Sequence, residues 1–293
     1  MTKTIAIMAP GEMGSFMGAT LTAHGGRVVT GAAGRSERSL ARARKAGFSI
    51  VASDDELLAE ADFVLSVVPP NAAVAVAERL RPALARTARK PLYVDCNAVS
   101  PSTVARVAAA VAPSGCDFVD GCLFGGPTSG KPGVMIYVSG PRAADVTALA
   151  PLGLVVRLLA GDIGAASALK LVFAALNKGF TAVGVMALLA AVRHSCGPEL
   201  IEQLSETQPG ILAYVSRFVP VMFPKAYRWA PEMEEIASLL EDDAEARDVF
   251  LALSRLYRRI GQDVAPVERD HVRALRAFCQ DAAARGAAPA GKS

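Results

Sequence analysis

The chain of 293 residues is long enough for two domains, and its composition is that of a folded protein with little charge bias. Hydrophobic residues make up 52% and charged residues 20%, a balance that excludes disorder for most of the chain. The formal net charge of +3 comes from scattered side chains with no basic stripe between aromatics, so we expect no nucleic-acid partner.

Cysteine and histidine usage predicts neither disulfides nor a metal site. The five cysteines include no C-x-x-C pair, which is typical of reduced thiols in a cytoplasmic protein. His24, His194 and His271 lie far apart, without ligand spacing. A glycine turn stands where a signal peptide would have its cleavage region, and the longest uncharged apolar stretch, Gly179 to Val192, has only 14 residues. We therefore expect a cytoplasmic protein with no membrane partner.

The chain opens with a predicted strand, Thr4 to Ala9, then a glycine turn, then a helix from Ser15 to Leu21. The turn reads Ala9-Pro10-Gly11-Glu12-Met13-Gly14, so Gly11 and Gly14 occupy the second and third positions of G-x-G-x-x-G and Ala9 replaces the first glycine. A strand, a tight turn and a helix N-terminus place backbone N–H groups where a pyrophosphate binds. The turn predicts a dinucleotide site, and the alternative is an ordinary strand-turn-helix.

Strand and helix patterns alternate up to about residue 160, as in a doubly wound parallel sheet with helices on both faces. Helix N-caps are predicted at Ser100 and Asp54. Residues 1–160 are therefore predicted to form an α/β Rossmann domain that binds a dinucleotide. Its later strands are predicted at Val28 to Gly31, Phe63 to Val68, Leu92 to Asp95, Phe118 to Asp120, Met135 to Ser139 and Leu154 to Leu158.

Strand patterns stop beyond Ala160. An Ala/Leu/Val-rich pattern predicts one long interdomain helix from Gly164 to Val192, and residues 161–280 are predicted to form an all-α domain. The segment 281–293 is rich in Ala, Gly and Pro, which predicts a frayed or disordered tail. Further helices are predicted at Glu199 to Ser205, Ile211 to Phe218, Pro231 to Leu240 and Ala244 to Ile260.

The residues after the second strand favour NADP over NAD. NAD enzymes usually have Asp or Glu here to bind the ribose 2′-OH, whereas this chain has Gly31-Ala32-Ala33-Gly34-Arg35-Ser36. With no carboxylate to repel a 2′-phosphate, the Arg35 guanidinium and the Ser36 hydroxyl are expected to bind one. The alternative is that both belong to a solvated loop and a helix cap.

A glycine pair marks a second candidate site. Gly125 and Gly126 end the segment that begins at Asp120, directly after a predicted strand. Paired glycines let the backbone approach a bound anion or carbonyl closely. The alternative is a glycine-rich turn between strands.

The long helix carries the third candidate site. Lys170 and Asn177 share a face with Phe173 between them, because seven residues make nearly two turns, and Lys178 points roughly 80° away. A lysine buried in an apolar helix costs free energy unless it is paired or titrates near neutrality, which makes Lys170 a candidate acid/base. The alternative is a snorkelling lysine at a domain boundary.

These motifs, in this order, resemble the β-hydroxyacid dehydrogenase family, which includes 3-hydroxyisobutyrate and 6-phosphogluconate dehydrogenases. The resemblance covers nearly the whole chain, and the part after Lys170 is similar to a subgroup with its own phosphogluconate-dehydrogenase-like helical domain. The matching segments are the cofactor turn Ala9 to Gly14, the loop Val67 to Pro70 beside the cofactor ribose, the loop Asp95 to Ala98 beside the nicotinamide, the substrate loop Asp120 to Gly126, the catalytic-helix motif Gly161 to Lys170, and Lys225 to Ile236.

The resemblance implies an NADP-dependent oxidoreductase that transfers hydride between the nicotinamide and a hydroxyl or carbonyl carbon of a small, hydroxyacid-like substrate. It implies Lys170 as general acid/base, with Asn177 as the second catalytic residue. It implies no metal. The residues implied to contact the substrate are Phe124, Gly125, Gly126, Phe173 and Lys178. Those implied to contact the cofactor are Val68, Pro69 and Asn97, in addition to the turn Ala9 to Gly14, Arg35 and Ser36.

Three positions depart from the family pattern. Phe124 and Ala174 replace the Ser and Asn of 3-hydroxyisobutyrate-type enzymes, which argues against those substrates. Asn177 replaces the general acid Glu of 6-phosphogluconate dehydrogenase and cannot transfer a proton, which argues against decarboxylation. The alternatives are an imine reductase, which generally lacks the lysine, and a non-catalytic NADP-binding regulator.

The resemblance also implies a homodimer, because related enzymes pair through their helical domains. Apolar residues lie all round the long helix, so the sheet domain of one subunit cannot cover them all and a second subunit is expected to cover the rest. The alternative is that the other C-terminal helices of the same chain cover them. Arg228, Trp229 and Glu232 are left without a role. The apolar residues are Phe173, Phe180, Val183, Val185, Met186 and Leu188.

Overall fold

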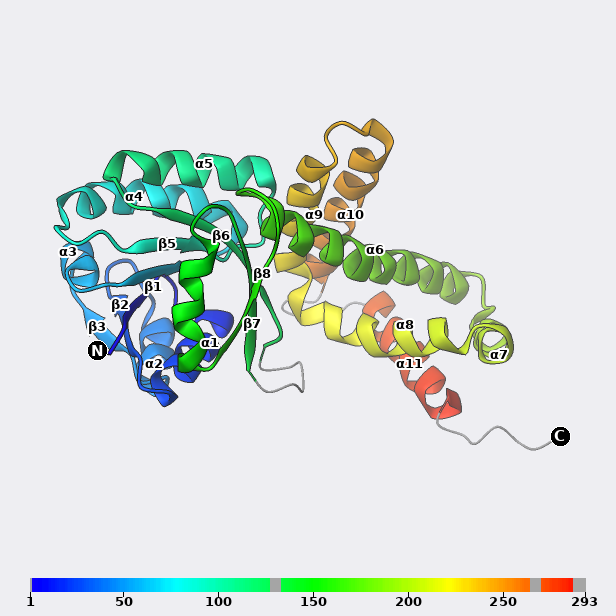
Figure 1. Ribbon diagram of the computed structural model, residues 1–293. Coiled ribbons are helices and arrows are strands. Elements are labelled where there is room, and N and C mark those ends of the chain that lie inside the picture. The colour runs from blue at the N-terminus through cyan, green and yellow to red at the C-terminus, as the bar shows by residue number, and fades with distance from the viewer. Residues whose placement is uncertain (1, 127–132, 264–269, 287–293) are drawn as a thin grey trace. The chain divides into compact units, whose positions relative to one another are not determined.

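The computed structural model describes residues 2–126, 133–263 and 270–286, which form two compact units that meet between Leu171 and Val172. The long helix α6 (Ala165–Arg193) begins in the first unit and continues in the second (Figure 1). The predicted boundary at residue 160 differs from this division, because the first turns of α6 belong with the sheet.

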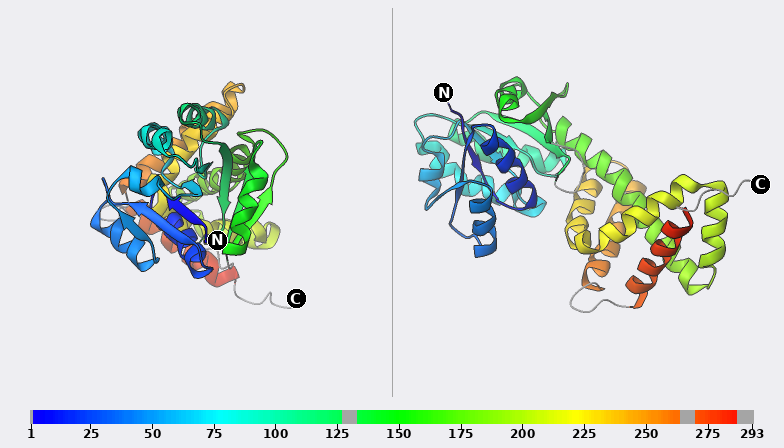
Figure 2. Two further views of the ribbon diagram at one scale, coloured as in Figure 1. Left: turned by 60° about the vertical axis from the view of Figure 1, so that its left-hand side comes forward. Right: turned by 90° about the horizontal axis from the view of Figure 1, so that it is seen from below.

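Within the described residues, the first unit contains one sheet in the order β3-β2-β1-β4-β5-β6-β7-β8 (Figures 1 and 2). The central strands β1, β4 and β5 are buried along their whole length, as expected where helices cover both faces. The strands are β1 (Thr4–Ile7), β2 (Arg27–Gly31), β3 (Ser49–Val51), β4 (Phe63–Ser66), β5 (Leu92–Asp95), β6 (Phe118–Phe124), β7 (Val134–Ser139) and β8 (Leu154–Leu158).

The α/β Rossmann class is confirmed, but the sheet is not wholly parallel. Strands β6 and β7 pair antiparallel, and the other neighbours pair in parallel. Only nine residues lie between Phe124 and Val134, too few for the crossover that a parallel pair needs. The sequence also missed β3, because a three-residue edge strand carries little periodicity.

Helices cover both faces of this sheet. Helices α1, α2 and η3 pack on one face through residues such as Met17, Ala43 and Leu149, and α3, α4 and α5 pack on the other through residues such as Leu57 and Leu80. The helices of this unit are α1 (Glu12–Ala23), α2 (Glu37–Lys45), α3 (Asp54–Leu58), η1 (Pro70–Ala72), α4 (Ala73–Arg86), α5 (Pro101–Val111), η2 (Ala112–Ser114) and η3 (Ala143–Leu152).

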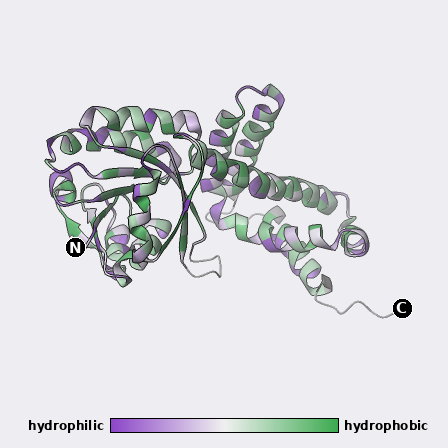
Figure 3. Ribbon diagram, in the orientation of Figure 1, coloured by the Kyte–Doolittle hydropathy of each residue, from purple (hydrophilic) through white to green (hydrophobic). Residues whose placement is uncertain are grey.

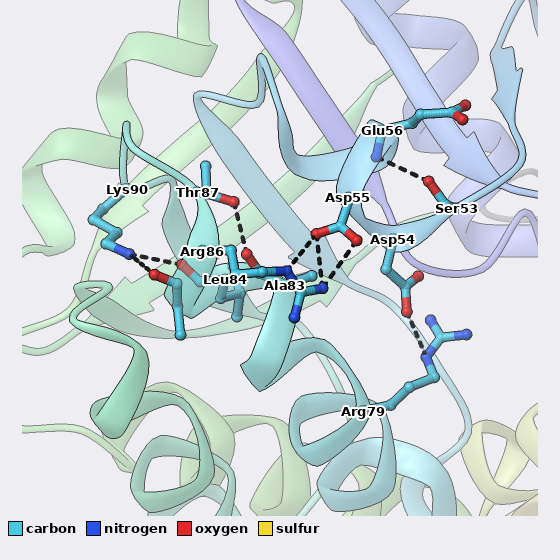
Figure 4. A network of polar contacts seen from close by, with 11 residues as sticks. Ser53, Asp54, Asp55, Glu56, Arg79, Ala83, Leu84, Arg86, Thr87 and Lys90 are labelled. Carbon is cyan, nitrogen blue, oxygen red and sulfur yellow. Dashed lines mark hydrogen bonds and ion pairs between the residues drawn. The ribbon is translucent and has the colours of Figure 1, made fainter.

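One of the two predicted helix caps is confirmed. Ser100 is the N-cap of α5, and its Oγ accepts a hydrogen bond from the Thr103 N–H at 3.2 Å. The cap predicted at Asp54 is wrong, because Ser53 accepts from the Glu56 N–H at 3.1 Å and Asp54 is the first helical residue (Figure 4). An N-cap residue has an extended backbone and accepts from an N–H two or three residues later, and Ser53 meets both conditions.

The second unit is helical throughout its described residues. Helices α7, α8 and α9 begin earlier than the sequence predicted, α10 begins at Ala244 as predicted, and α11 was not predicted. They are, after α6, α7 (Gly197–Thr207), α8 (Pro209–Met222), η4 (Phe223–Lys225), α9 (Ala226–Leu239), α10 (Ala244–Asp263) and α11 (Asp270–Gly286).

Helix α11 runs into the segment for which disorder was predicted. Its apolar residues Leu275, Phe278 and Ala282 are buried, and it packs against α8. Burial of this face stabilises the helix beyond what its Ala- and Gly-rich composition suggests. The predicted tail is therefore wrong for 281–286, and 287–293 lie outside the described residues.

This packing can be tested with Leu275→Ala. Because Leu275 is buried, we expect a loss of about 2 to 5 kcal/mol in the unfolding free energy of the helical unit. Trp229, the one tryptophan of the chain, lies in that unit, so chemical unfolding followed by its fluorescence is the measurement. Gln280→Ala, at an exposed position of the same helix, is the matched control. Equal unfolding midpoints in both variants would contradict the packing of α11.

Candidate functional site

The glycine turn has the geometry that a dinucleotide needs. A Cβ on Gly14 would lie 2.0 Å from the Ala9 carbonyl oxygen, so only glycine lets α1 pack this close to β1. A Cβ on Gly11 would meet no described atom within 4 Å, so the backbone there is open to a ligand. Gly11 is the N-cap of α1 and makes no side-chain cap bond, which leaves the helix N-terminus for an anion.

Arg35 is folded toward this turn. Its Nη2 donates a hydrogen bond to the carbonyl of Met8, at the end of β1. Its buried Nε has no hydrogen-bond partner among the described residues. Burial and the charge of Arg79 lower the pKa of Arg35, against the opposite effect of Asp54. A guanidinium with a buried free N–H and an unfavourable environment fits a site that takes a further anion.

Ser36 is engaged locally. It is the N-cap of α2, and its Oγ accepts from the Ser39 N–H at 3.3 Å. The structure therefore agrees with the alternative stated for Ser36, that its side chain caps a helix. Its hydroxyl also donates to Ser39 Oγ at 3.2 Å, so both bonds of the Ser36 side chain are made within the first turn of α2.

The loops beside the predicted ribose and nicotinamide positions are joined by Asn97. Its Oδ1 accepts from the Val68 N–H at 2.6 Å, and its Nδ2 donates to Ser66 Oγ at 2.9 Å and to the Asp95 carboxylate. The Asn97 side chain is therefore fully used within the protein. It positions the loop after β4, where Val68 is half-buried and Pro69 is exposed.

A buried polar row crosses four strands beneath this loop. Ser66, Asp95, Asp120 and Ser139 are register partners on β4, β5, β6 and β7, and all four are buried. Burial, and then the nearby Asp120 charge, raise the pKa of Asp95 to about 7. Asp95 Oδ2 has no hydrogen-bond partner among the described atoms, and a proton would let it donate.

Asp120 holds the start of α6 to the sheet. Its Oδ2 accepts from the N–H groups of Gly164 at 2.9 Å and Ser167 at 3.0 Å, and from Ser139 Oγ at 3.2 Å. Its Oδ1 accepts from Ser167 Oγ at 2.6 Å. A carboxylate at a helix N-terminus also meets the positive end of the helix dipole. This contact fixes the helix that carries Lys170.

Lys170 lies beside the segment that leads to the glycine pair. Its Nζ donates to the Leu123 carbonyl at 2.8 Å and lies 4.7 Å from the centre of the Phe124 ring, which itself packs edge-on against Tyr137. Burial lowers the pKa of Lys170, against a smaller opposite effect of Cys122. The lysine is thus a half-buried amine that gives up its proton more readily than a surface lysine.

The glycine pair touches the cofactor turn. Gly125 and Gly126 have φ of +88° and +147°, a backbone region that side chains disfavour. A Cβ on Gly126 would lie 3.0 Å from Met13 Sδ. The turn, the glycine pair and Lys170 therefore converge within the first unit.

The other predicted site residues on α6 lie in the second unit. Asn177 donates to the Phe173 carbonyl at 3.0 Å, one turn back on the helix, and the Phe173 ring is half exposed. Lys178, predicted to bind substrate, forms an ion pair with Glu232 and lies 5.3 Å from the Trp229 ring centre. Glu232 and Trp229, which had no predicted role, thus hold Lys178 inside the helical unit.

Sequence reasoning missed several residues of this arrangement. Ser66, Ser139 and Ser167 carry no motif, and only register and helix placement bring them to the two aspartates. Asp54 and Arg79 reach the cofactor end from separate elements. Ser66 and Ser139 are polar residues at the ends of apolar strands, which is a weak signal in the sequence. Among the described residues, no group of three or more His, Cys, Asp or Glu could hold a metal ion.

A strand-turn-helix that can hold a dinucleotide, with a lysine beside it, is the arrangement typical of nicotinamide-dependent oxidoreductases. A family model described as the NAD binding domain of 6-phosphogluconate dehydrogenase matches residues 4–153, about half of the chain. A second model, described as a domain of unknown function (DUF1932), matches residues 191–260. The chain therefore belongs to the 6-phosphogluconate dehydrogenase NAD-binding family, in a hydroxyacid-dehydrogenase-like subgroup with its own helical domain.

Known proteins agree with this assignment. The 3-hydroxyisobutyrate dehydrogenase of Pseudomonas aeruginosa is 28% identical over 174 residues, 58% of each protein. A Mycobacterium tuberculosis 3-hydroxyisobutyrate dehydrogenase structure with L-serine shares the fold at a TM-score of 0.68 and 20% identity, over 95% of this chain and 99% of that one. The structure of an Aspergillus terreus reductive aminase with NADPH and ethyl levulinate shares the fold at a TM-score of 0.54 and 20% identity, over 95% of this chain and 100% of that one.

The buried row predicts a pH dependence of stability that Asp95→Asn removes. The folded protein keeps a proton on Asp95 up to a pH of about 7, whereas an unfolded chain releases it near pH 4. The Asp95 contribution to stability is therefore full below about pH 4 and is lost as the pH rises toward 7.

We therefore expect Asp95→Asn to gain stability relative to wild type as the pH rises over this window, by up to about 1.4 kcal/mol per pH unit. Urea unfolding at several pH values measures the difference. Asp145→Asn, an exposed aspartate of η3, is the control and should follow wild type. Parallel curves for wild type and Asp95→Asn would show that the carboxyl is not buried as described.

Proposed function

We propose that this protein is an NADP(H)-dependent oxidoreductase that transfers hydride between the nicotinamide and a hydroxyl or carbonyl carbon of a small, hydroxyacid-like substrate. The observation that carries the proposal is the convergence of the Gly11–Gly14 turn, the glycine pair and Lys170 in one unit. The turn and α1 would hold the pyrophosphate, and Arg35 would bind the 2′-phosphate. NADP supplies the hydride acceptor, and NADPH the donor.

Lys170 supplies the proton chemistry. In oxidation, the neutral amine takes the substrate hydroxyl proton as hydride leaves the same carbon; in reduction, the ammonium returns it to the oxygen. Its lowered pKa raises the neutral fraction that oxidation needs. Leu123 O orients the amine, and Gly125 and Gly126 let the substrate approach the backbone.

The wall around the amine favours a substrate less polar than 3-hydroxyisobutyrate. Phe124 lies beneath the Lys170 Nζ and is held edge-on by Tyr137. An aromatic face offers no hydrogen-bond donor in the place where 3-hydroxyisobutyrate-type enzymes are implied to have Ser. A bulkier apolar group on the substrate would bury surface against this ring.

A second candidate is imine reduction on the same scaffold. The likeness in fold to a reductive aminase supports it. Lys170 favours C–O chemistry, because the resemblance implies that imine reductases generally lack this lysine. A screen of hydroxyacids, aldehydes and cyclic imines with NADP(H), followed by nicotinamide absorbance, separates the two. A regulator without turnover would give no change with any of them.

Lys170→Ala is the direct test. We expect kcat to fall about a hundredfold or more, since a positioned acid/base contributes on the order of 10²–10⁴ to the rate. The Kd for NADPH should change little. Lys90→Ala, a lysine that caps α4 through the Leu84 and Ala85 carbonyls, is the control and should keep full turnover. Equal turnover in Lys170→Ala and wild type would refute the acid/base role.

We also propose that the protein is a homodimer that pairs through α6. An apolar stripe at steps of three and four residues, formed by Phe173, Leu176, Phe180 and Val183, is exposed along this helix. Figure 3 shows that most of the long helix is coloured as hydrophobic. Val185 and Leu188, two of the apolar residues that the sequence places round this helix, are buried within the chain. A second copy would remove the stripe from water.

By length and composition α6 is also apolar enough to cross a membrane, which the 14-residue stretch did not suggest. Two observations favour a protein partner over lipid. The first turns of α6 are bonded to Asp120, and Lys178 is paired with Glu232 on a neighbouring helix. Both place charged or polar groups of this helix inside folded protein.

Leu176→Lys tests the dimer, because Leu176 is 71% exposed and central in the stripe. We expect light scattering at micromolar concentration to give about twice the 30.4 kDa chain mass for wild type and one chain mass for the variant. Leu158→Lys, at an exposed apolar position of β8, should remain dimeric. A wild-type mass of one chain would refute the dimer.

A further inference from the structure

A carboxylate reaches the end of β2 from a distant part of the sequence. Strand β3 pairs in parallel with β2, with Val51 opposite Gly31, and α3 begins three residues later at Asp54. A Cβ on Gly31 would lie 4.0 Å from Asp54 Oδ1. In dinucleotide folds, an acidic residue at this end of β2 binds the ribose 2′-OH of NAD. Asp54 thus supplies the negative charge that the sequence after β2 lacks.

This charge has a partner on α4. Arg79 Nε lies 3.5 Å from Asp54 Oδ2, and Figure 4 shows the two side chains facing each other between α3 and α4. The side chains are 40% and 25% exposed, so both remain open to a ligand. At this distance the positive charge of Arg79 offsets the negative charge of Asp54, and the carboxylate stays accessible to a ligand.

Arg35 completes the group of charges. The charges of Arg79 and Asp54 both act on the Arg35 guanidinium, with opposite signs. Arg35, Arg79 and Asp54 together carry one net positive charge. Arg35 Nε is a buried N–H without a partner among the described atoms. An anion here would offset the repulsion between the arginines and use the free N–H.

We propose that the Asp54–Arg79 pair sets the cofactor preference. Arg79 neutralises Asp54 and, together with Arg35, makes the site accept the 2′-phosphate of NADP. Without Arg79, the freed carboxylate repels the phosphate and accepts a hydrogen bond from the 2′-OH of NAD. This inference rests on the proposed nicotinamide-dependent function, and its test can fail separately from that function.

The experiment measures Kd for NADPH and NADH, and for 2′,5′-ADP and 5′-AMP, which report on the phosphate without the nicotinamide. For Arg79→Ala we expect NADPH and 2′,5′-ADP to bind at least tenfold more weakly, with NADH and 5′-AMP unchanged or tighter. Asp54→Asn should do the opposite and tighten NADPH and 2′,5′-ADP. Arg35→Ala should weaken the same two ligands, because it removes a charge-assisted contact.

The chain offers a matched control in the adjacent ion pair. Asp55 and Arg86 also join α3 to α4, through three hydrogen bonds of 2.8 to 3.0 Å, but not at Gly31 (Figure 4). Arg86→Ala should lose the same link between helices and leave the NADPH:NADH ratio unchanged. If Arg79→Ala and Asp54→Asn change the ratio no more than Arg86→Ala does, the pair does not set the preference. If wild type binds neither dinucleotide, the proposed function fails as well.

Discussion

The buried carboxylate of Asp120 is the contact on which the candidate site depends. It ends no strand and touches no solvent, yet its two oxygens accept four hydrogen bonds from β7 and from the start of α6. A buried charge is tolerated only when it is paired or hydrogen-bonded in this way. Because the helix start is fixed to the sheet, Lys170, one turn further on, is held at the Leu123 carbonyl rather than in solvent. Asp120, at the head of the segment that leads to the glycine pair, therefore anchors the helix that carries Lys170.

The same buried row links that anchor to the loops at the cofactor side. Asp95 lies next to Asp120 in register. Asn97 links Asp95 to the loop after β4, because its Nδ2 donates to the Asp95 carboxylate and its Oδ1 accepts from the Val68 N–H. Burial, and then the charge of Asp120, raise the pKa of Asp95, so this carboxyl keeps its proton to a higher pH. Asp95 Oδ2 has no hydrogen-bond donor among the described residues that would stabilise its charged form.

The helical unit shows a different use of charge. Lys178, Glu232 and Trp229 form a compact cluster between helices, and Tyr257 donates to the Lys178 carbonyl. A half-buried pair of this kind costs desolvation and gains little net stability, but breaking it would leave one charge uncompensated. The cluster fixes how α9 and α10 pack on α6. The apolar stripe of α6 is left outside that packing, which is why we assign it to a second copy of the chain.

The sequence by itself determined the class of fold, the cofactor turn and the candidate lysine. Each of these is local: a strand, a glycine turn and a helix read off consecutive residues, and Lys170 stands out because charge is rare in an apolar helix. The sequence also singled out Gly125 and Gly126 but left a glycine-rich turn between strands open. In the structure the two glycines have positive φ and begin the connection from β6 to the antiparallel strand β7.

Only the tertiary structure decided which side chains meet. The antiparallel return of β7, the short strand β3 and the buried helix α11 depend on connection length and burial, which local periodicity does not contain. Register then brought Ser66, Asp95, Asp120 and Ser139 into one row. The pairing of β2 with β3 carried Asp54 to the end of β2, more than twenty residues away in sequence, and so reversed the view that no carboxylate lies there. Motifs record neighbours along the chain, whereas electrostatics depends on neighbours in space.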